Sequence, residues 1–301
     1  MTQNVFFHFL FSHSDTMSIS ITATRPKFRY LSAWFCPFAH RATLALEHHA
    51  GSIEYEWVEA LGWEQRKDDQ NVTGTGKEWW YHWKADELKR SNPSALVPTL
   101  IPVSKSGQVD ESKAVYESLV TIDFVDQISG ATGMNRLVPE DPYEAARCRI
   151  WADKLNRETC SPYYGVLVRK VETERMEHFQ NLVKGLKAFD RELQKTDGPT
   201  FLANAQLSSV DLSILPWAYR YYVFEHYRGP EYIIPTSGLE AYHEWYKYVI
   251  NLPSVKRTLP DKGKYLEHIG KYADSSARSK VANAVRRGVS AHELNDELDE
   301  Y

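Results

Sequence analysis

The 301-residue sequence has few cysteines, almost no net charge and no long apolar run, and each shortage excludes a class of protein. Its cysteines are an odd number and far apart, which excludes a disulfide framework and suits a reducing compartment. The formal charge of −4 argues against general nucleic-acid binding. No segment approaches the roughly 18 apolar residues that are needed to span a bilayer. We therefore expect a cytoplasmic protein without a nucleic-acid or membrane partner.

The first 24 residues predict no folded element. The apolar run Val5–Phe11 is at best a weak signal peptide, because no Lys or Arg precedes Arg25 and no clear cleavage site follows. Met17 is an alternative start, so residues 1–16 need not belong to the mature chain. We expect residues 1–24 to form a disordered tail.

The rest of the chain divides into an α/β half and an all-α half. Residues 27–36 and 53–58 have the patterns of strands and flank a helical pattern at 37–50, which predicts a parallel pair joined by a right-handed crossover. A charged, insertion-like loop follows at 62–92, then a strand at 96–103 and a helix at 119–128. We expect the first domain to span residues 25–128.

The second half contains four long helical patterns, at 143–158, 169–194, 208–224 and 238–250. Glycines and prolines at 129–142 mark a linker, so we expect a helical domain at 143–272. Residues 273–301 carry separated basic and acidic runs, which are typical of a solvated helix or a disordered tail.

Cys36 stands where an apolar strand pattern meets a helix. Pro37 follows it directly and suits the first helical position, where its missing N–H costs nothing. The unpaired N–H groups and the positive end of the macrodipole favour a thiolate at such a place. A nucleophilic cysteine is therefore one interpretation, and a small buried hydrophobe is the other. His40 lies one turn further on, either lowering the Cys36 pKa or facing solvent.

Five short motifs occur in one order along the chain, namely Cys-Pro-Phe-Ala-His-Arg at 36–41, Lys77-Glu78-Trp79-Trp80, Val97-Pro98, Glu117-Ser118, and Ser208-Ser209-Val210-Asp211 before Leu215-Pro216-Trp217. As a set they resemble a cytosolic glutathione transferase over residues 27–255, and specifically the omega class, which has cysteine where most classes use tyrosine or serine. The resemblance implies an α/β thioredoxin-like domain, then an all-α C-terminal helical bundle, and a homodimer. Ser208 and Asp211 form a capping box, which is a structural role.

The resemblance also implies a glutathione site. A cis Pro98 exposes the backbone of Val97 to an extended peptide such as glutathione; an ordinary trans edge proline is the alternative. Glu117 and Ser118 begin a helix, which suits the γ-glutamyl end of glutathione, although plain helix capping explains them equally well. Phe38 belongs to the same implied site.

Three further residues rest on the resemblance. Lys77 corresponds to the lysine that meets the glycyl carboxylate, but the spacing from Lys77 to Asn92-Pro93 is longer than in the family, and a solvated lysine is the alternative. Trp217 and Tyr221 share one helix face and are expected to line the acceptor pocket, whereas Arg220 is expected to point elsewhere. Aromatic residues at helical spacing are otherwise core residues.

These residues together predict a glutathione-dependent thiol transferase. Cys36 forms a mixed disulfide with glutathione, and a second glutathione resolves it because Ala39 stands where a dithiol enzyme has its resolving cysteine. The substrate is a small disulfide, a dehydroascorbate-type acceptor or an electrophile; glutathione is the co-substrate, and no metal is expected. One alternative is an enzyme that conjugates glutathione to a specialised metabolite or removes it, and another is a non-enzymatic regulatory protein of the same fold.

Overall fold

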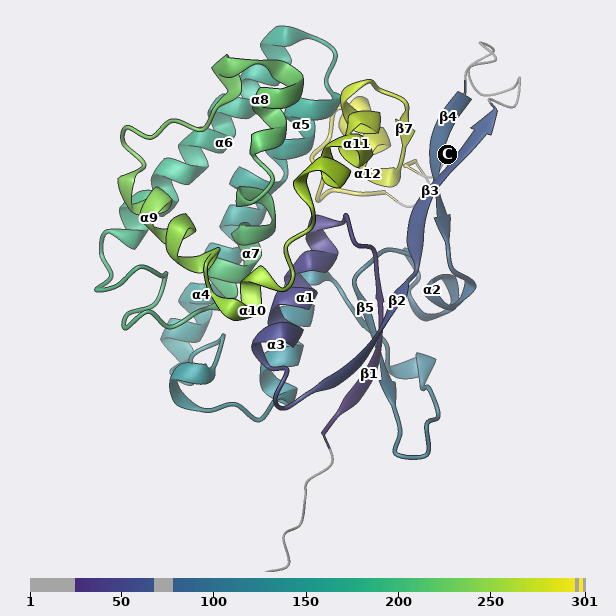
Figure 1. Cartoon of the computed structure of the whole chain (residues 1–301), viewed down its shortest axis with the longest axis vertical. Helices are drawn as coiled ribbons and strands as arrows, with labels where there is room; N and C mark the ends of the chain where they lie inside the picture. The colour runs from purple at the N-terminus through teal and green to yellow at the C-terminus, as the bar shows by residue number, and fades with distance from the viewer. Residues whose placement is uncertain (1–24, 68–77, 296–297, 300–301) are drawn as a thin grey trace, which may run out of the picture.

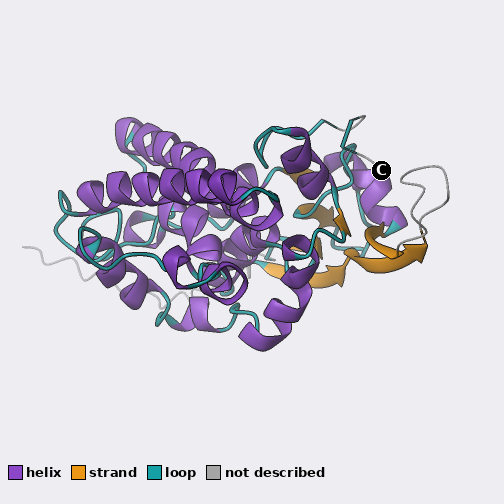
Figure 2. Ribbon diagram, turned by 90° about the horizontal axis from the view of Figure 1, so that it is seen from above, coloured by secondary structure: helices purple, strands orange, loops and turns teal. Residues whose placement is uncertain are grey.

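The computed structural model describes residues 25–67, 78–295 and 298–299 (Figure 1). Strands gather on one side of the molecule and most helices on the other (Figure 2). This arrangement confirms the predicted fold class, a thioredoxin-like α/β unit followed by a helical unit.

The first unit is built on a four-stranded sheet of order β2-β1-β5-β6. The strands span Lys27–Ser32 (β1), Glu54–Glu59 (β2), Thr99–Val103 (β5) and Val115–Tyr116 (β6). β1 and β2 are parallel, as predicted, and helix α1 (Pro37–His48) forms the crossover between them. Helix α3 (Ser118–Ile128) packs beside α1. Phe28, Tyr30 and Leu31 of β1 are buried. Phe28 packs edge-on against Phe124 of α3, and the Tyr30 hydroxyl donates to the Ala39 carbonyl of α1.

The segment predicted to be an irregular loop at 62–92 contains regular structure instead. β3 (Leu61–Lys67) and β4 (Glu78–Lys84) form an antiparallel pair, and α2 (Asp86–Ser91) follows. The charged residues of this segment concealed its strand propensity, which comes from aromatic cross-strand pairs. Trp63 and His82 are directly opposite each other, with ring centroids 4.0 Å apart.

The second unit is a set of helices that matches the predicted helical half. They are α4 (Pro142–Leu155), α5 (Pro162–Val168), α6 (Glu172–Leu193), α7 (Ser209–Ala218), α8 (Tyr222–Arg228), α9 (Glu240–Val249), α10 (Pro253–Lys256) and α11 (Lys262–Ala273). Shorter helical turns are η1 (Glu111–Lys113), η2 (Gly133–Asn135), η3 (Asn156–Cys160) and η4 (Pro230–Tyr232). The single helix predicted at 208–224 is two helices, α7 and α8, separated at residues 219–221.

The predicted capping box is present at the start of α7. The Ser208 hydroxyl accepts from the Asp211 N–H, and the Asp211 carboxylate accepts from the Ser208 N–H at 2.8 Å. The same carboxylate accepts from Trp245 Nε1 at 2.8 Å. The box therefore ties α7 to α9 as well as starting α7.

The C-terminal segment is folded onto the molecule, not solvated as we expected. β7 (Ala277–Arg278) pairs with β4 in parallel, and α12 (Lys280–Arg287) packs against α5. Ala277, Ala282 and Val285 are buried in these contacts. Sequence patterns missed the segment because small alanines between basic residues make a weak apolar stripe.

No helix in the described ranges is long and apolar enough to cross a membrane.

Candidate functional site

The sheet register brings the predicted site residues to one edge. Thr99 of β5 pairs with Leu31 of β1 on one side and with Tyr116 of β6 on the other, both antiparallel. Pro98, the segment after β1 and Glu117 therefore meet at the same end of the sheet. The Val97-Pro98 peptide bond is cis, as the resemblance implies.

Cys36 is the N-cap residue of α1 and is partly exposed. Its N–H donates to the Ala33 carbonyl at 3.0 Å, and its own carbonyl accepts from the His40 N–H at 2.9 Å. The backbone N–H groups of Ala39 and Phe38 in the first turn of α1 lower its pKa, although the sulfur makes no capping hydrogen bond. The sulfur therefore lies at the helix N-terminus that the sequence predicted.

The net direction of the Cys36 pKa is nevertheless upward. Burial raises the pKa of the thiol, and this effect exceeds the lowering by the two N–H groups and by the guanidinium groups of Arg220 and Arg41. The expectation of a net lowered pKa is therefore wrong, because we counted the helix N-terminus and not the desolvation by the helical unit packed over it.

Arg41 is completely buried between α1, α3 and α7. It donates to the Ser213 carbonyl at 2.8 Å and to the Ser118 hydroxyl at 3.0 Å, and its guanidinium lies 4.3 Å from the Trp217 ring centroid. Burial lowers its pKa. These hydrogen-bond acceptors are neutral, so Arg41 brings a positive charge into the interior beside the start of α3.

Arg220 is also completely buried, and it does not point away as we expected. It donates to the Pro216 carbonyl at 2.6 Å and to His40 Nδ1 at 3.1 Å, while its Nε and Nη2 atoms are buried without a hydrogen-bond partner. Its charge lowers the Cys36 pKa. A buried cation with unused donors favours a negative charge nearby.

His40 is buried and does not face solvent. Its Nε2 atom lies 2.8 Å from the Thr258 hydroxyl, and its Nδ1 atom accepts from Arg220. Burial and the Arg220 charge hold the His40 pKa well below its usual value. His40 is therefore neutral at pH 7, and it positions Arg220 without adding a charge beside Cys36.

The residues predicted for the γ-glutamyl end of glutathione lie at the start of α3. Glu117 is exposed and occupies the N-cap with φ of 68°, a conformation that residues other than glycine rarely adopt. Its side chain makes no capping hydrogen bond, which weighs against simple capping. Ser118 is buried and receives the hydrogen bond from Arg41.

The aromatic residues of the predicted site differ in exposure. Phe38 is half-buried and packs edge-on against Trp217, with centroids 4.8 Å apart. Trp217 and Tyr221 are buried, and the Tyr221 hydroxyl donates to the Thr159 carbonyl at 3.4 Å. Their place in an acceptor pocket stays a prediction. Lys77 lies outside the described residues.

Sequence reasoning missed three tyrosines near Cys36, namely Tyr164 on α5 and Tyr265 and Tyr272 on α11. Burial raises the pKa of each hydroxyl, and Cys36 acts in the same direction, which places the hydroxyls within electrostatic range of the sulfur. The seven-residue spacing of Tyr265 and Tyr272 was the available signal, since it puts both on one helix face.

The other cysteines are buried in the helical unit, Cys148 on α4 and Cys160 in η3. Burial raises the pKa of both thiols, to about 12 for Cys148. Among the described residues, no group of three or more His, Cys, Asp or Glu side chains is placed to hold a metal ion.

Comparison with known proteins identifies the first unit. Residues 35–128 match the family model "Glutathione S-transferase, N-terminal domain". Glutathione S-transferase U27 of Arabidopsis thaliana is 26% identical over 79% of this chain and 91% of its own length. Glutathione S-transferase omega-1 of Sus scrofa is 28% identical over 63% of this chain and 65% of its own.

Solved structures extend the similarity to the whole described fold. Glutathione transferase Omega 3C from Trametes versicolor has a TM-score of 0.62 at 25% identity, covering 84% of this chain and 92% of its own. A rice glutathione transferase in complex with glutathione has a TM-score of 0.64 at 22% identity, covering 84% and 99%, and shares the fold. Residues 35–128 thus match a glutathione S-transferase N-terminal domain, and most of the chain is similar to glutathione S-transferases in sequence and in fold.

Proposed function

We propose that this chain is a glutathione-dependent thiol transferase in which Cys36 carries glutathione as a mixed disulfide. The observation that carries the proposal is the surroundings of the sulfur: helix N–H groups of Phe38 and Ala39 and two buried guanidinium groups all favour its thiolate. A cysteine that served only for packing needs none of these charges.

The proposed reaction has two exchange steps. The Cys36 thiolate attacks the glutathione sulfur of a mixed disulfide, the S–S bond breaks, and the substrate leaves as a thiolate that takes a proton from water. The thiolate of a second glutathione then attacks the same glutathione sulfur, which releases oxidised glutathione and restores the Cys36 thiolate. Ala39 supplies no internal resolving thiol.

Glutathione binding is proposed at the edge of the sheet. The Ser118 oxygen accepts from Arg41, so its O–H is directed toward another acceptor, and we assign it the γ-glutamyl carboxylate. Glu117 is exposed beside it and takes the ammonium group. The backbone of Val97 before cis Pro98 pairs with the peptide, Phe38 packs against it, and Lys77 takes the glycyl carboxylate.

The alternative function is conjugation or deconjugation of glutathione on a metabolite. The raised Cys36 pKa favours this alternative. A Cys36 thiol that stays protonated donates a hydrogen bond to the sulfur of glutathione and forms no covalent bond with it. Trp217 and Tyr221 would then lie near the acceptor.

Two substrates separate these functions. The purified wild type and Cys36→Ser are assayed with glutathione and a small glutathionyl mixed disulfide, and in parallel with an aromatic halide. Thiol transfer by the wild type and its loss, by about 100-fold or more, in Cys36→Ser supports the proposal. Halide conjugation retained in Cys36→Ser, with no thiol transfer by the wild type, contradicts it. Cys148→Ser is the matched control and should keep both activities of the wild type.

We also propose that the domains divide at the linker 129–142, that the chain forms a homodimer, and that it acts in the cytoplasm. Light scattering of the purified chain tests the dimer, for which twice the 34.8 kDa chain mass is expected.

A further inference from the structure

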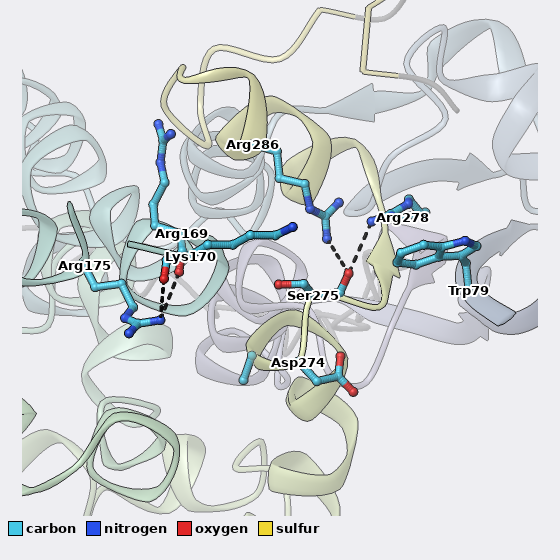
Figure 3. Close-up of a pocket in the computed structure, with 9 residues that line it drawn as sticks. Trp79, Arg169, Lys170, Arg175, Asp274, Ser275, Arg278 and Arg286 are labelled. Carbon is cyan, nitrogen blue, oxygen red and sulfur yellow. Dashed lines mark hydrogen bonds between the residues drawn. The ribbon is translucent and has the colours of Figure 1, made fainter. Parts of the chain in front are cut away.

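A second pocket lies where the C-terminal segment packs against the helical unit. A cavity of about 350 Å³ opens between the turn before α6, the end of α11, β7 and α12, with Trp79 of β4 at one side (Figure 3). We call it the basic pocket, because its wall holds the cations Arg169, Lys170, Arg175, Arg278 and Arg286. Its volume suits a small molecule.

Two cations of the basic pocket have no carboxylate partner among the described residues. Asp274 is the acidic residue among the described lining residues, Glu172 pairs with Arg175, and Glu174 lies 3.8 Å from Arg169. No described carboxylate forms an ion pair with Lys170 or Arg286. The Asp274 carboxylate accepts from the Ser276 N–H at 2.8 Å and points away from the guanidinium groups of Arg278 and Arg286 (Figure 3).

Two of these cations are held close together by a single acceptor. Arg278 Nη1 and Arg286 Nη2 both donate to the Ser275 carbonyl, at 3.3 and 3.2 Å (Figure 3). The other hydrogen-bond acceptors of Arg286 are the Asn283 amide oxygen and the Ala277 carbonyl, which are also neutral. Burial and the neighbouring Arg278 lower the Arg286 pKa to about 10. Holding two guanidinium groups together is unfavourable, and an anion bound beside Arg286 would offset part of this repulsion.

The opposite wall is also fixed. Arg175 donates to the carbonyls of Arg169 and Lys170, at 3.4 and 3.3 Å, and so shapes the turn that carries them (Figure 3). Arg169 Nε is buried without a hydrogen-bond partner. The exposed Lys170 side chain extends toward Arg286 (Figure 3). Donors of Arg169 and Lys170 on one wall thus lie opposite Arg286 on the other.

We propose that the basic pocket binds a small molecule with at least two anionic groups, phosphates or carboxylates. Guanidinium groups bind both kinds of oxyanion through paired hydrogen bonds, and Lys170 and Arg286, which have no carboxylate partner among the described residues, match the two charges of a dianion. The wall joins α6, α11, β7 and α12, so bound anion holds the C-terminal segment against the helical unit.

Calorimetry with inorganic pyrophosphate and citrate tests the proposal at low salt, with acetate as the monovalent comparison. We expect saturable binding of pyrophosphate or citrate, at least about tenfold tighter than acetate. Preference for pyrophosphate indicates a phosphorylated ligand and preference for citrate a polycarboxylate. Absence of saturable heat with both overturns the proposal.

Variants locate the binding. Lys170→Glu removes an exposed wall cation with little risk to folding and should weaken binding about tenfold or more. Lys247→Glu makes the same charge change on exposed α9 and should leave it unchanged. Equal weakening by both variants shows diffuse attraction and overturns the proposal.

A competition measurement separates this site from the glutathione site. Saturating S-methylglutathione should leave pyrophosphate or citrate binding unchanged. Displacement of pyrophosphate or citrate by S-methylglutathione would show that the basic pocket is part of the glutathione site, and would overturn the proposal of a separate anion site. Failure of Cys36 in thiol transfer leaves this binding result unaffected, so the two proposals fail independently.

Discussion

The chain holds two groups of arginines that differ in their surroundings. Arg41 and Arg220 beside Cys36 are completely buried, and their guanidinium groups donate to neutral acceptors. The arginines of the basic pocket are partly exposed, and Arg175 and Arg169 have carboxylates nearby. Water and salt reach the second group but not the first.

This difference separates two uses of positive charge. A buried guanidinium acts on one nearby atom at low effective dielectric, whereas a partly exposed cluster acts by its summed charge and is screened by salt. The buried pair therefore suits control of a single thiol, and the basic pocket suits capture of a ligand from solution.

The largest expected difference is in stability. Arg41→Ala leaves the Ser213 carbonyl and the Ser118 hydroxyl without their donor and opens a cavity under Trp217, so we expect a loss of about 3 kcal/mol in the free energy of unfolding. Lys170→Ala in the basic pocket should cost less than about 0.5 kcal/mol. Urea unfolding measures both, and similar losses would remove the distinction between the two groups.

The pH dependence of Cys36 is the next largest effect. Because its pKa is raised, the thiolate fraction should rise about tenfold per pH unit from pH 6 to 8, about 100-fold in total. The rate of alkylation of Cys36 by iodoacetamide, followed by mass spectrometry in a Cys148→Ser, Cys160→Ser background, reports this fraction. A plateau below pH 7 would show a lowered pKa.

Arg220→Gln tests one member of the buried pair. Loss of its charge should raise the Cys36 pKa further and so slow alkylation at pH 7, by about tenfold. Arg278→Gln is the matched control in the basic pocket and should change the rate less than about twofold. An unchanged pH profile in Arg220→Gln would exclude Arg220 as a positioning residue for the thiolate.

The smallest effect is that of salt. Raising NaCl from 0.05 to 0.5 M should change the alkylation rate of Cys36 less than about twofold, because its arginines are buried. Binding of pyrophosphate in the basic pocket should weaken about tenfold or more over the same range. Equal salt sensitivity of the two measurements would contradict the distinction between the buried arginines near Cys36 and the partly exposed cations of the basic pocket.

The features that could be predicted from the sequence are those that depend on residues close together in the chain. The β1–α1–β2 unit, the place of Cys36 at a helix start and the capping box at Ser208 and Asp211 follow from nearby residues, and the structure has all three. The motif order also predicted the similarity to glutathione S-transferases and the cis bond before Pro98.

What the sequence did not predict depends on packing between distant segments. The raised pKa of Cys36 comes from the helical unit that buries it, and Arg220 lies 184 positions away along the chain. His40 is neutral for the same reason. The basic pocket joins Arg169 to Arg286, and it exists because α12, which we expected to be solvated, packs against α5.

The most direct test is the intact mass of the chain after incubation with oxidised glutathione, followed by peptide mapping. A Cys36 that carries glutathione predicts one adduct, mapped to Cys36 and absent in Cys36→Ser. No adduct, or an adduct on Cys148 or Cys160, would contradict the account.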